Sequence, residues 1–251
     1  MLYIEGAAGI SGDMTVGALL SLGASQERLK EVLVSLKLGD EFSYVISEKA
    51  SYGIAGTDFD VILPHRHHHH EHGHHHHHEH RNLADVESII DRGEMSDRAR
   101  SLAKKAFRFV AEAEAKAHGR SLDEVHFHEV GAIDSIVDIV SAAVLFDDLG
   151  ETECVVTGLT EGSGTVMCAH GELPVPVPAV LNIAAATGVP LRVSDVKGEC
   201  VTPTGIALAA AFRTRETLPA AYRVKGVGIG LGKRDYGRPA ILRIMKIEAA
   251  E

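Results

Sequence analysis

The sequence predicts an α/β fold in which a mixed sheet is flanked by helices. Short apolar or alternating segments, typical of strands, alternate along the chain with amphipathic segments of helical spacing. This alternation favours helices layered on a sheet. The 251 residues, 45% hydrophobic and 24% charged, suffice to bury a sizeable core without disulfides.

The first half of the chain has clear start and stop signals. A short apolar strand runs into a glycine-rich turn, and the longest helix has Ser96 as a suitable N-cap and Gly119 as its stop. In order, we expect a strand at 2–4, a turn at 6–12, helices at 13–22 and 26–36, strands at 42–48 and 54–63, and helices at 82–92 and 96–118.

The second half is divided by glycine and proline. Gly162 and Gly164 mark a turn, and three prolines between 174 and 178 exclude a central strand and lead into a helix ending near 187. We also expect a helix from about 133 to 149, a strand at 154–159, a helix at 202–214 with Pro203 in its first turn, and two strands within 222–247. The predicted division is 1–64, an insertion at 65–81, and 82–251, with the first and last parts forming one α/β domain.

Composition excludes several classes of protein. The net charge of −10, with His neutral, argues against a general nucleic-acid or anionic-membrane binder. The start MLYIEG is not a secretory signal, and no apolar stretch reaches the ~18 residues of a membrane helix, so we expect a cytoplasmic protein. Cys154, Cys168 and Cys200 are far apart, which predicts neither a thiolate zinc site nor a disulfide framework.

Twelve of the 16 histidines lie between residues 65 and 80. Imidazole suits Ni, Cu, Zn and Co ions, and we favour nickel. An expression tag is a poor explanation, because the tract is internal and interrupted by Glu71, Gly73 and Glu79; a solvated low-complexity loop is the other alternative. We predict a disordered, metal-binding insertion whose ligands are His67, His68, His69, His70, His72, His74, His75, His76, His77, His78 and His80.

A glycine turn joins the first strand to the first helix. Glycines let a backbone approach an anion, and a helix N-terminus carries partial positive charge, so Gly9, Ser11 and Gly12 are predicted to bind a phosphate. The spacing is neither GxGxxG nor a P-loop. The alternative is a purely structural turn, with Asp13 capping the helix.

Histidines and carboxylates also gather between residues 126 and 138. His126 and His128 point to the same side if the chain is extended, and Asp134 and Asp138 are four apart on one helix face. Asp138 is unusual because the apolar residues around it place it close to the buried face. A solvated loop with a capping Asp134 is the alternative.

We predict His126 and His128 as metal ligands, and a catalytic group made of Asp13, His128, Glu129 and Asp134. These residues supply a neutral ligand and an anionic base side by side. Weaker candidates are His170, Cys200 and the hydroxyls of Thr202 and Thr204, which are equally suited to capping a helix.

Six motifs occur in order along nearly the whole chain: AGISGDM at 8–14, the His-rich insertion, HFHEVGAIDSIVDIV at 126–140, PVPVPA at 174–179, TPTG at 202–205 and GIGLGKRDYGRPAILRIM at 228–245. Together these motifs resemble the nickel insertion proteins of nickel-pincer cofactor biosynthesis, the pyridinium-3,5-bisthiocarboxylic acid mononucleotide nickel chelatases. Glu5-Gly6 departs from the Asp that the family pattern has before the glycine turn.

The resemblance implies a cyclometallase of the lyase class. Such a protein inserts Ni(II) into the mononucleotide, forming two nickel–sulfur bonds and one nickel–carbon bond, with CTP and Mg or Mn. Family members usually continue into a C-terminal domain associated with oligomerisation and metal–CTP binding, so the resemblance implies either a separate C-terminal partner subunit or a short form. The competing interpretations are a nickel store or delivery protein without catalysis, and a metal-dependent hydrolase using His126 and His128.

Overall fold

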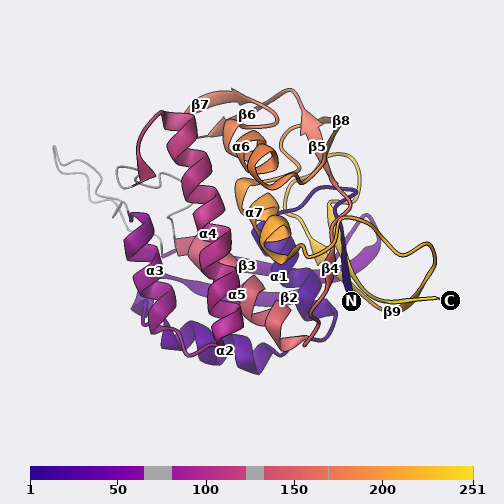
Figure 1. Ribbon diagram of the computed structural model, residues 1–251, viewed down its shortest axis with the longest axis horizontal. Helices are drawn as coiled ribbons and strands as arrows, with labels where there is room; N and C mark the ends of the chain where they lie inside the picture. The colour runs from indigo at the N-terminus through magenta and orange to yellow at the C-terminus, as the bar shows by residue number, and fades with distance from the viewer. Residues whose placement is uncertain (65–80, 123–132, 169, 251) are drawn as a thin grey trace.

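The fold is α/β, as the sequence predicts, and is built on a mixed sheet. The computed structural model describes residues 1–64, 81–122, 133–168 and 170–250 (Figure 1). Within these residues a six-stranded sheet has the order β2-β3-β9-β10-β1-β4. Its strands are β1 (Leu2–Glu5), β2 (Ser43–Ser51), β3 (Ile54–Ile62), β4 (Cys154–Val155), β9 (Tyr222–Leu231) and β10 (Ile241–Ala249).

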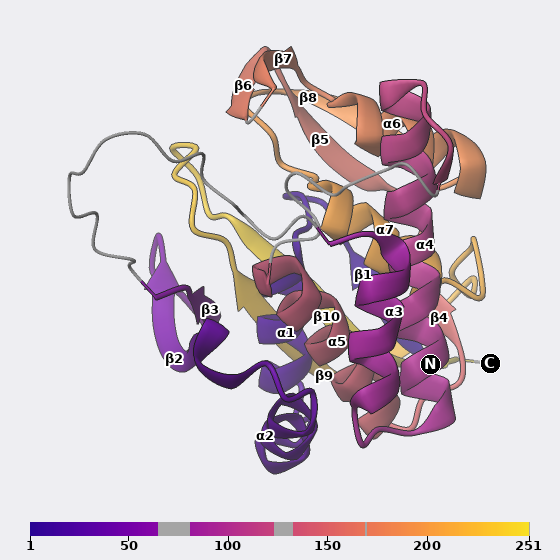
Figure 2. The same cartoon turned by 90° about the vertical axis from the view of Figure 1, so that its left-hand side faces the viewer.

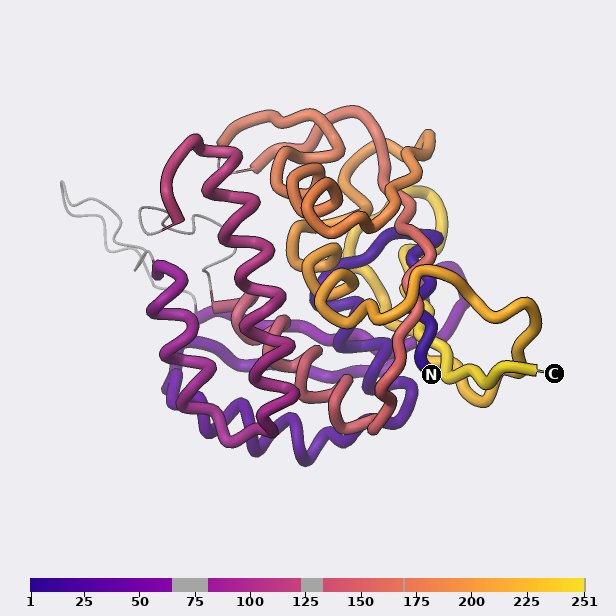
Figure 3. Tube along the Cα trace, in the orientation of Figure 1, coloured from indigo at the N-terminus to yellow at the C-terminus, as the bar shows by residue number. Residues whose placement is uncertain are grey.

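The first and last strands of the chain are neighbours in this sheet. β1 pairs antiparallel with β10, so that Tyr3 lies opposite Met245, and parallel with β4 on its other side. The amino group of Met1 donates to the carbonyl of Ile247 at 3.1 Å. Figure 3 shows the two chain ends on the same side of the molecule. The sheet therefore pairs the first strand of the chain with the last.

Helices are stacked in layers on one face of the sheet. α1 (Gly12–Ser21) packs on β3 and β9, α5 (Ile133–Asp148) packs on α1, and α4 (Asp97–His118) packs on α5 (Figure 2). Gly228 and Gly230 allow α1 to approach β9 closely, because a Cβ at either position would overlap the backbone of α1. The layers bury a continuous apolar core that includes Leu19, Phe107 and Ile136.

The helix boundaries agree with the sequence signals because capping side chains set them. The side chains of Ser25, Asn82, Ser96 and Thr202 each accept a backbone N–H from the first turn. Gly119 ends α4 in the left-handed conformation. The remaining helices are α2 (Gln26–Ser35), η1 (Gly39–Glu41), α3 (Leu83–Arg92), α6 (Pro178–Thr187) and α7 (Pro203–Phe212).

The segment after α5 differs from the prediction. The strand expected at 154–159 ends at Val155, because Leu159 donates its N–H to Pro190 and begins another strand. Gly162, expected in a turn, lies buried inside that strand, and the turn is at Gly164. The strands that the sequence did not reveal are β5 (Leu159–Ser163) with β8 (Leu191–Lys197), and the hairpin β6 (Thr165–Cys168) with β7 (Gly171–Pro174).

The predicted insertion and the predicted division of the chain both depend on residues that the structure does not describe. Residues 65–80, which hold the predicted His-rich insertion, lie outside the described residues. The division into 1–64, 65–81 and 82–251 therefore stays a prediction. Within the ranges described, no helix is long and apolar enough to cross a membrane.

Candidate active site

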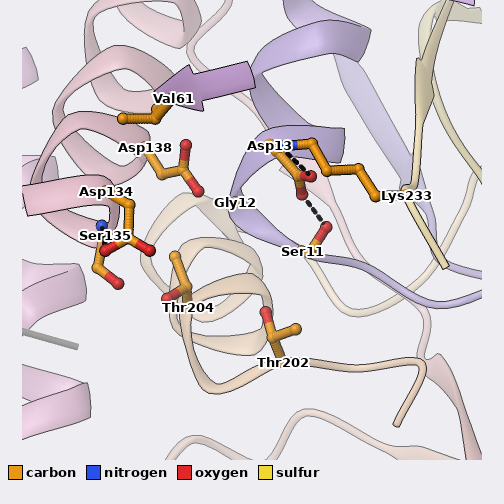
Figure 4. Close-up of a pocket in the computed structure, with 10 residues that line it drawn as sticks. All are labelled: Ser11, Gly12, Asp13, Val61, Asp134, Ser135, Asp138, Thr202, Thr204 and Lys233. Atoms are coloured by element: carbon orange, nitrogen blue, oxygen red, sulfur yellow. Dashed lines mark hydrogen bonds and ion pairs between the residues drawn. The ribbon is translucent and has the colours of Figure 1, made fainter. Parts of the chain in front are cut away.

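A cavity of about 250 Å³ lies at the N-terminal end of α1, where the first turns of α5 and α7 also meet (Figure 4). Asp134 and Asp138 reach it from one face of α5, as their spacing of four predicts. The tertiary fold thus joins predicted residues that are far apart in sequence. The lining residues are Ser11, Gly12, Asp13, Val61, Asp134, Ser135, Asp138, Thr202, Thr204 and Lys233.

The glycine turn is fixed to the segment that precedes α7. The N–H of Ile10 donates to the carbonyl of Cys200 at 2.9 Å, and the N–H of Thr202 donates to the carbonyl of Ile10 at 3.0 Å. Gly9 has a φ of +98°, and a Cβ there would overlap the Cys200 carbonyl. Glycine is therefore required at position 9 for this close approach. Gly9, predicted as a phosphate contact, does not line the cavity.

A buried carboxylate, that of Glu161, binds the backbone of the segment that precedes α7. Glu161 is fully buried, and its Oε1 accepts the N–H groups of Gly162 at 2.7 Å, Cys200 at 2.6 Å and Val201 at 2.9 Å. Burial raises the pKa of Glu161, and the three N–H groups only partly oppose this rise. Sequence reasoning missed Glu161; its one signal is a carboxylate inside the uncharged run LTEGSG.

The start of α1 has no capping bond from its N-cap residue. Ser11 occupies the N-cap, but its hydroxyl donates to Asp13 Oδ1 instead of accepting a backbone N–H. Asp13 Oδ1 also accepts the N–H of Met14 at 2.9 Å. The positive end of the helix dipole therefore lies at the cavity wall without a capping side chain from Ser11.

Asp138 has the most strongly shifted pKa of the residues that line the cavity. Its Oδ1 is buried and has no hydrogen-bond partner among the described residues, although the side chain is partly exposed. Burial raises the pKa of Asp138 well above its ordinary value, and the charges of Asp13 and Asp134 raise it further. Lys233 and the backbone N–H of Asp13 oppose this rise without cancelling it.

Lys233 supplies the positive charge of the cavity. Its ammonium lies 3.6 Å from Asp13 Oδ2 and forms an ion pair with Asp60. Burial alone lowers the pKa of Lys233, but the hydrogen bond to Asp60 and the neighbouring carboxylates outweigh it, so the pKa is raised. The lysine follows β9 and was not predicted, because nothing local in GKRDYG indicates where it reaches.

A second cavity of about 200 Å³ shares four lining residues with the first: Ser11, Asp13, Thr202 and Lys233. Its other walls include Cys200, Glu199, Arg234 and Tyr236. Arg234 Nη1 lies 3.2 Å from Glu199 Oε2. Burial raises the pKa of the Cys200 thiol, and the Glu161 charge adds to this. The two cavities therefore adjoin across a common wall that carries both signs of charge.

Several predicted residues cannot be placed at the site. His126, His128 and Glu129 lie outside the described residues, as do the histidines between 65 and 80. His170 lies against His118 instead of lining either cavity, with 4.9 Å between ring centroids. In the described ranges, no three or more His, Cys, Asp or Glu side chains are grouped so as to hold a metal ion.

Comparison with known proteins decides the family. The family model described as nickel insertion protein matches residues 2–251. This chain belongs to the nickel insertion protein family. The resemblance predicted from the motifs is thereby confirmed. No solved structure matches the chain.

Relatives of this family are longer than the chain. A pyridinium-3,5-bisthiocarboxylic acid mononucleotide nickel insertion protein from Alkaliphilus metalliredigens is 52% identical over 98% of this chain and 60% of its own length. Proteins with the same name from Acetivibrio thermocellus and Clostridium kluyveri are 43% and 42% identical over 100% and 97% of the chain, each over 61% of its own length. The chain thus spans about 60% of the length of these relatives.

Proposed function

We propose that this chain takes part in inserting nickel into pyridinium-3,5-bisthiocarboxylic acid mononucleotide, which yields the nickel-pincer cofactor. Membership of the nickel insertion family and the names of its relatives support the reaction. The observation that carries the proposal is the cavity at the start of α1, where carboxylates, hydroxyls, a lysine and a helix N-terminus converge. We assign the reaction to the lyase class and the protein to the cytoplasm.

The cavity suits both the negatively charged phosphate of the mononucleotide and the positively charged nickel ion. A phosphate of the mononucleotide is favoured at Ser11 and Gly12 by the dipole of α1 and by the nearby Lys233 ammonium. Nickel in transit needs exchangeable oxygen or nitrogen ligands before it is transferred to sulfur, and Asp13 and Asp134 offer oxygen. The carboxylates and the proposed phosphate position thus line the same cavity.

The histidine-bearing segments complete the proposal. His126 and His128 are the proposed metal ligands, while Glu129 and Asp134, with Asp13, form the inner site of metal transfer or proton removal. The His-rich tract at residues 65–80 serves as a reservoir that raises the local nickel concentration.

CTP with Mg or Mn is the proposed co-substrate. We propose that CTP binds to a C-terminal partner subunit. The described residues provide no group of three His, Cys, Asp or Glu side chains that could hold a metal ion, so we assign the CTP–metal site to none of them. The greater length of the relatives is consistent with a further part that this chain requires.

The test is to mix the purified chain with the precursor, Ni(II), CTP and Mg(II), with and without the remaining portion of a longer relative. Formation of the metallated mononucleotide, followed by mass spectrometry, is the expected result. Glu129→Gln is expected to lower the rate by about 10²- to 10⁴-fold even at saturating nickel, as for loss of a general base. Replacing the tract histidines by asparagine should slow product formation at limiting nickel, and excess nickel should restore the rate.

The second candidate is a nickel storage or delivery protein without catalysis of its own. It is favoured by the density of histidines in the tract and by the lack of a three-ligand group in the described part of the chain. This candidate predicts that added nickel rescues the Glu129 and tract variants equally.

A further inference from the structure

The second cavity has no part in the proposed function, and its walls differ from those of the first. Asp134 and Asp138 line the first cavity alone. The second cavity, of about 200 Å³, combines apolar side chains, such as those of Met14 and Ala240, with the guanidinium of Arg234. This combination suits an organic group with a negatively charged substituent better than it suits a metal ion.

Arg234 is held in place by the residues around it. Its Nη1 donates to the carbonyl of Glu199 at 3.2 Å and lies 3.2 Å from Glu199 Oε2, so it also neutralises the carboxylate of that residue. The hydroxyl of Tyr236 donates to the same carbonyl. A guanidinium has five N–H donors in one plane, and this fork matches a carboxylate with two parallel hydrogen bonds. Arg234 is therefore positioned in advance and keeps donors for an acid group.

A second guanidinium, that of Arg238, lies beside the same cavity. Burial raises the pKa of Cys200, which lines the cavity, and the charge of Arg238 partly opposes this rise, so the guanidinium lies close to the thiol. Arg238 Nη2 is buried and has no hydrogen-bond partner among the described residues. A buried donor without an acceptor is unfavourable. This side of the cavity thus has an unused donor, as expected next to a negatively charged ligand.

The size of the second cavity limits what it can hold. A cavity of about 150 Å³ is known to bind benzene. The second cavity, at about 200 Å³, therefore has room for one six-membered ring with small substituents, but not for a whole mononucleotide. The rest of a mononucleotide can lie in the first cavity, because the two share a wall made by Ser11, Asp13, Thr202 and Lys233 (Figure 4).

We propose that the second cavity binds the pyridinium ring of the mononucleotide, with an acid group of the ring on Arg234. This inference rests on the proposed function and assigns the ring to a subsite, while the phosphate stays at Ser11 and Gly12. The aromatic ring of Tyr236 suits a positively charged pyridinium, because a cation is attracted to the face of an aromatic ring. Asp13, in the common wall, places a nickel ion that it holds next to the bound ring.

The first experiment uses two probes that differ in one ring substituent. Nicotinic acid mononucleotide carries a carboxylate where nicotinamide mononucleotide carries a neutral carboxamide, and both carry the same phosphate. In calorimetric titrations without metal, wild type should bind the acid about tenfold more tightly or better, the effect of one charge-assisted hydrogen bond.

Substitution of Arg234 should remove this preference. Arg234→Gln should weaken binding of the acid to the level of the amide and leave the affinity for the amide unchanged. Arg192→Gln, at an exposed arginine, is the matched control and should keep the preference. A wild type without a preference for the acid, or an Arg234→Gln variant that keeps it, would overturn the proposal.

The second experiment needs no substitution, so it is independent of whether the variant folds. Cys200 lines the second cavity and not the first. With nicotinic acid mononucleotide at ten times its Kd, alkylation of Cys200 by iodoacetamide should slow roughly tenfold, because only the free fraction of the protein reacts. The rate at Cys168, which lines neither cavity, should stay the same. An unchanged rate at Cys200 would place the ring elsewhere and overturn the proposal.

The failure of this inference can be told apart from the failure of the proposed function. If both binding results hold but the chain forms no metallated product, even with the remaining portion of a longer relative, the proposed function fails and the cavity stands as a site for pyridine mononucleotide acids. If product forms but wild type shows neither the preference nor the protection of Cys200, the proposed function stands and the ring binds elsewhere.

Discussion

The carboxylate of Asp138 lies so close to the Cα of Gly12 that a Cβ at position 12 would overlap it. The contact joins the first residue of α1 to the second turn of α5, across the wall of the larger cavity. Glycine at position 12 is therefore a requirement of tertiary packing, in addition to any role in binding an anion.

This contact predicts the effect of a side chain at position 12. Gly12→Val should abolish binding of the mononucleotide precursor, because the new side chain fills the approach to the start of α1, and should cost about 1–3 kcal/mol of stability by overpacking. Calorimetric titration and urea unfolding measure the two effects. Gly226→Ala is the matched control, since its Cβ would meet only the flexible end of Leu22 at 3.3 Å. Normal binding of the precursor by Gly12→Val would show that the turn is purely structural.

The pair also predicts an energetic coupling. Gly12→Ala should be less destabilising in an Asp138→Ala background, because the carboxylate that it overlaps is then absent and only the Cβ of residue 138, at 2.7 Å, remains in the way. Residues in contact typically show coupling energies of about 0.5–3 kcal/mol in a double-mutant cycle. Additive effects of the two substitutions would contradict the close contact.

The buried acceptor Glu161 predicts a large loss of stability on substitution. Glu161→Leu leaves three backbone N–H groups without their acceptor, at a cost of about 1–3 kcal/mol for each buried unsatisfied group. Glu161→Gln keeps one carbonyl oxygen in place as an acceptor, so its loss of stability should be much smaller. Urea unfolding compares both with the exposed variant Glu31→Gln. Equal stability of the leucine and glutamine variants would contradict this account of Glu161.

The three cysteines should react with alkylating reagents in a fixed order. Burial raises the pKa of Cys154 to about 12, so almost none of it is thiolate at neutral pH, and burial raises the pKa of Cys200 as well. Cys168 is partly exposed and should be modified first in the native protein. Peptide mass spectrometry after brief treatment with iodoacetamide measures the order. Modification of native Cys154 as fast as Cys168 would contradict its burial.

The histidines between 65 and 80 predict nickel binding that depends on pH. Imidazole binds metal only when neutral, and its unperturbed pKa is about 6.5, so binding should weaken sharply below that pH. Titration calorimetry compares wild type with a variant in which the tract histidines are replaced by asparagine. If both bind the same number of Ni(II) ions, the tract is not the nickel reservoir.

Local patterns in the sequence determined the fold class and most of the helices. Ser96 and Gly119 delimit α4 because a capping hydroxyl and a left-handed glycine act within one turn of the helix. The spacing of Asp134 and Asp138 placed both on one face of α5, and the apolar residues between them indicated that Asp138 lies near the core. Such signals are local, so they can be read without knowing the fold.

Only the tertiary structure decided how distant segments meet. Leu159 leaves the expected strand because a parallel partner, β8, is available to it, and no local propensity reports that partner. Lys233 reaches Asp13, and Glu161 holds the backbone at Cys200, through packing between segments far apart in the chain. The sequence by itself therefore determined the elements and the residue types of the site, while long-range strand pairing and helix packing decided which of these residues meet in the cavity.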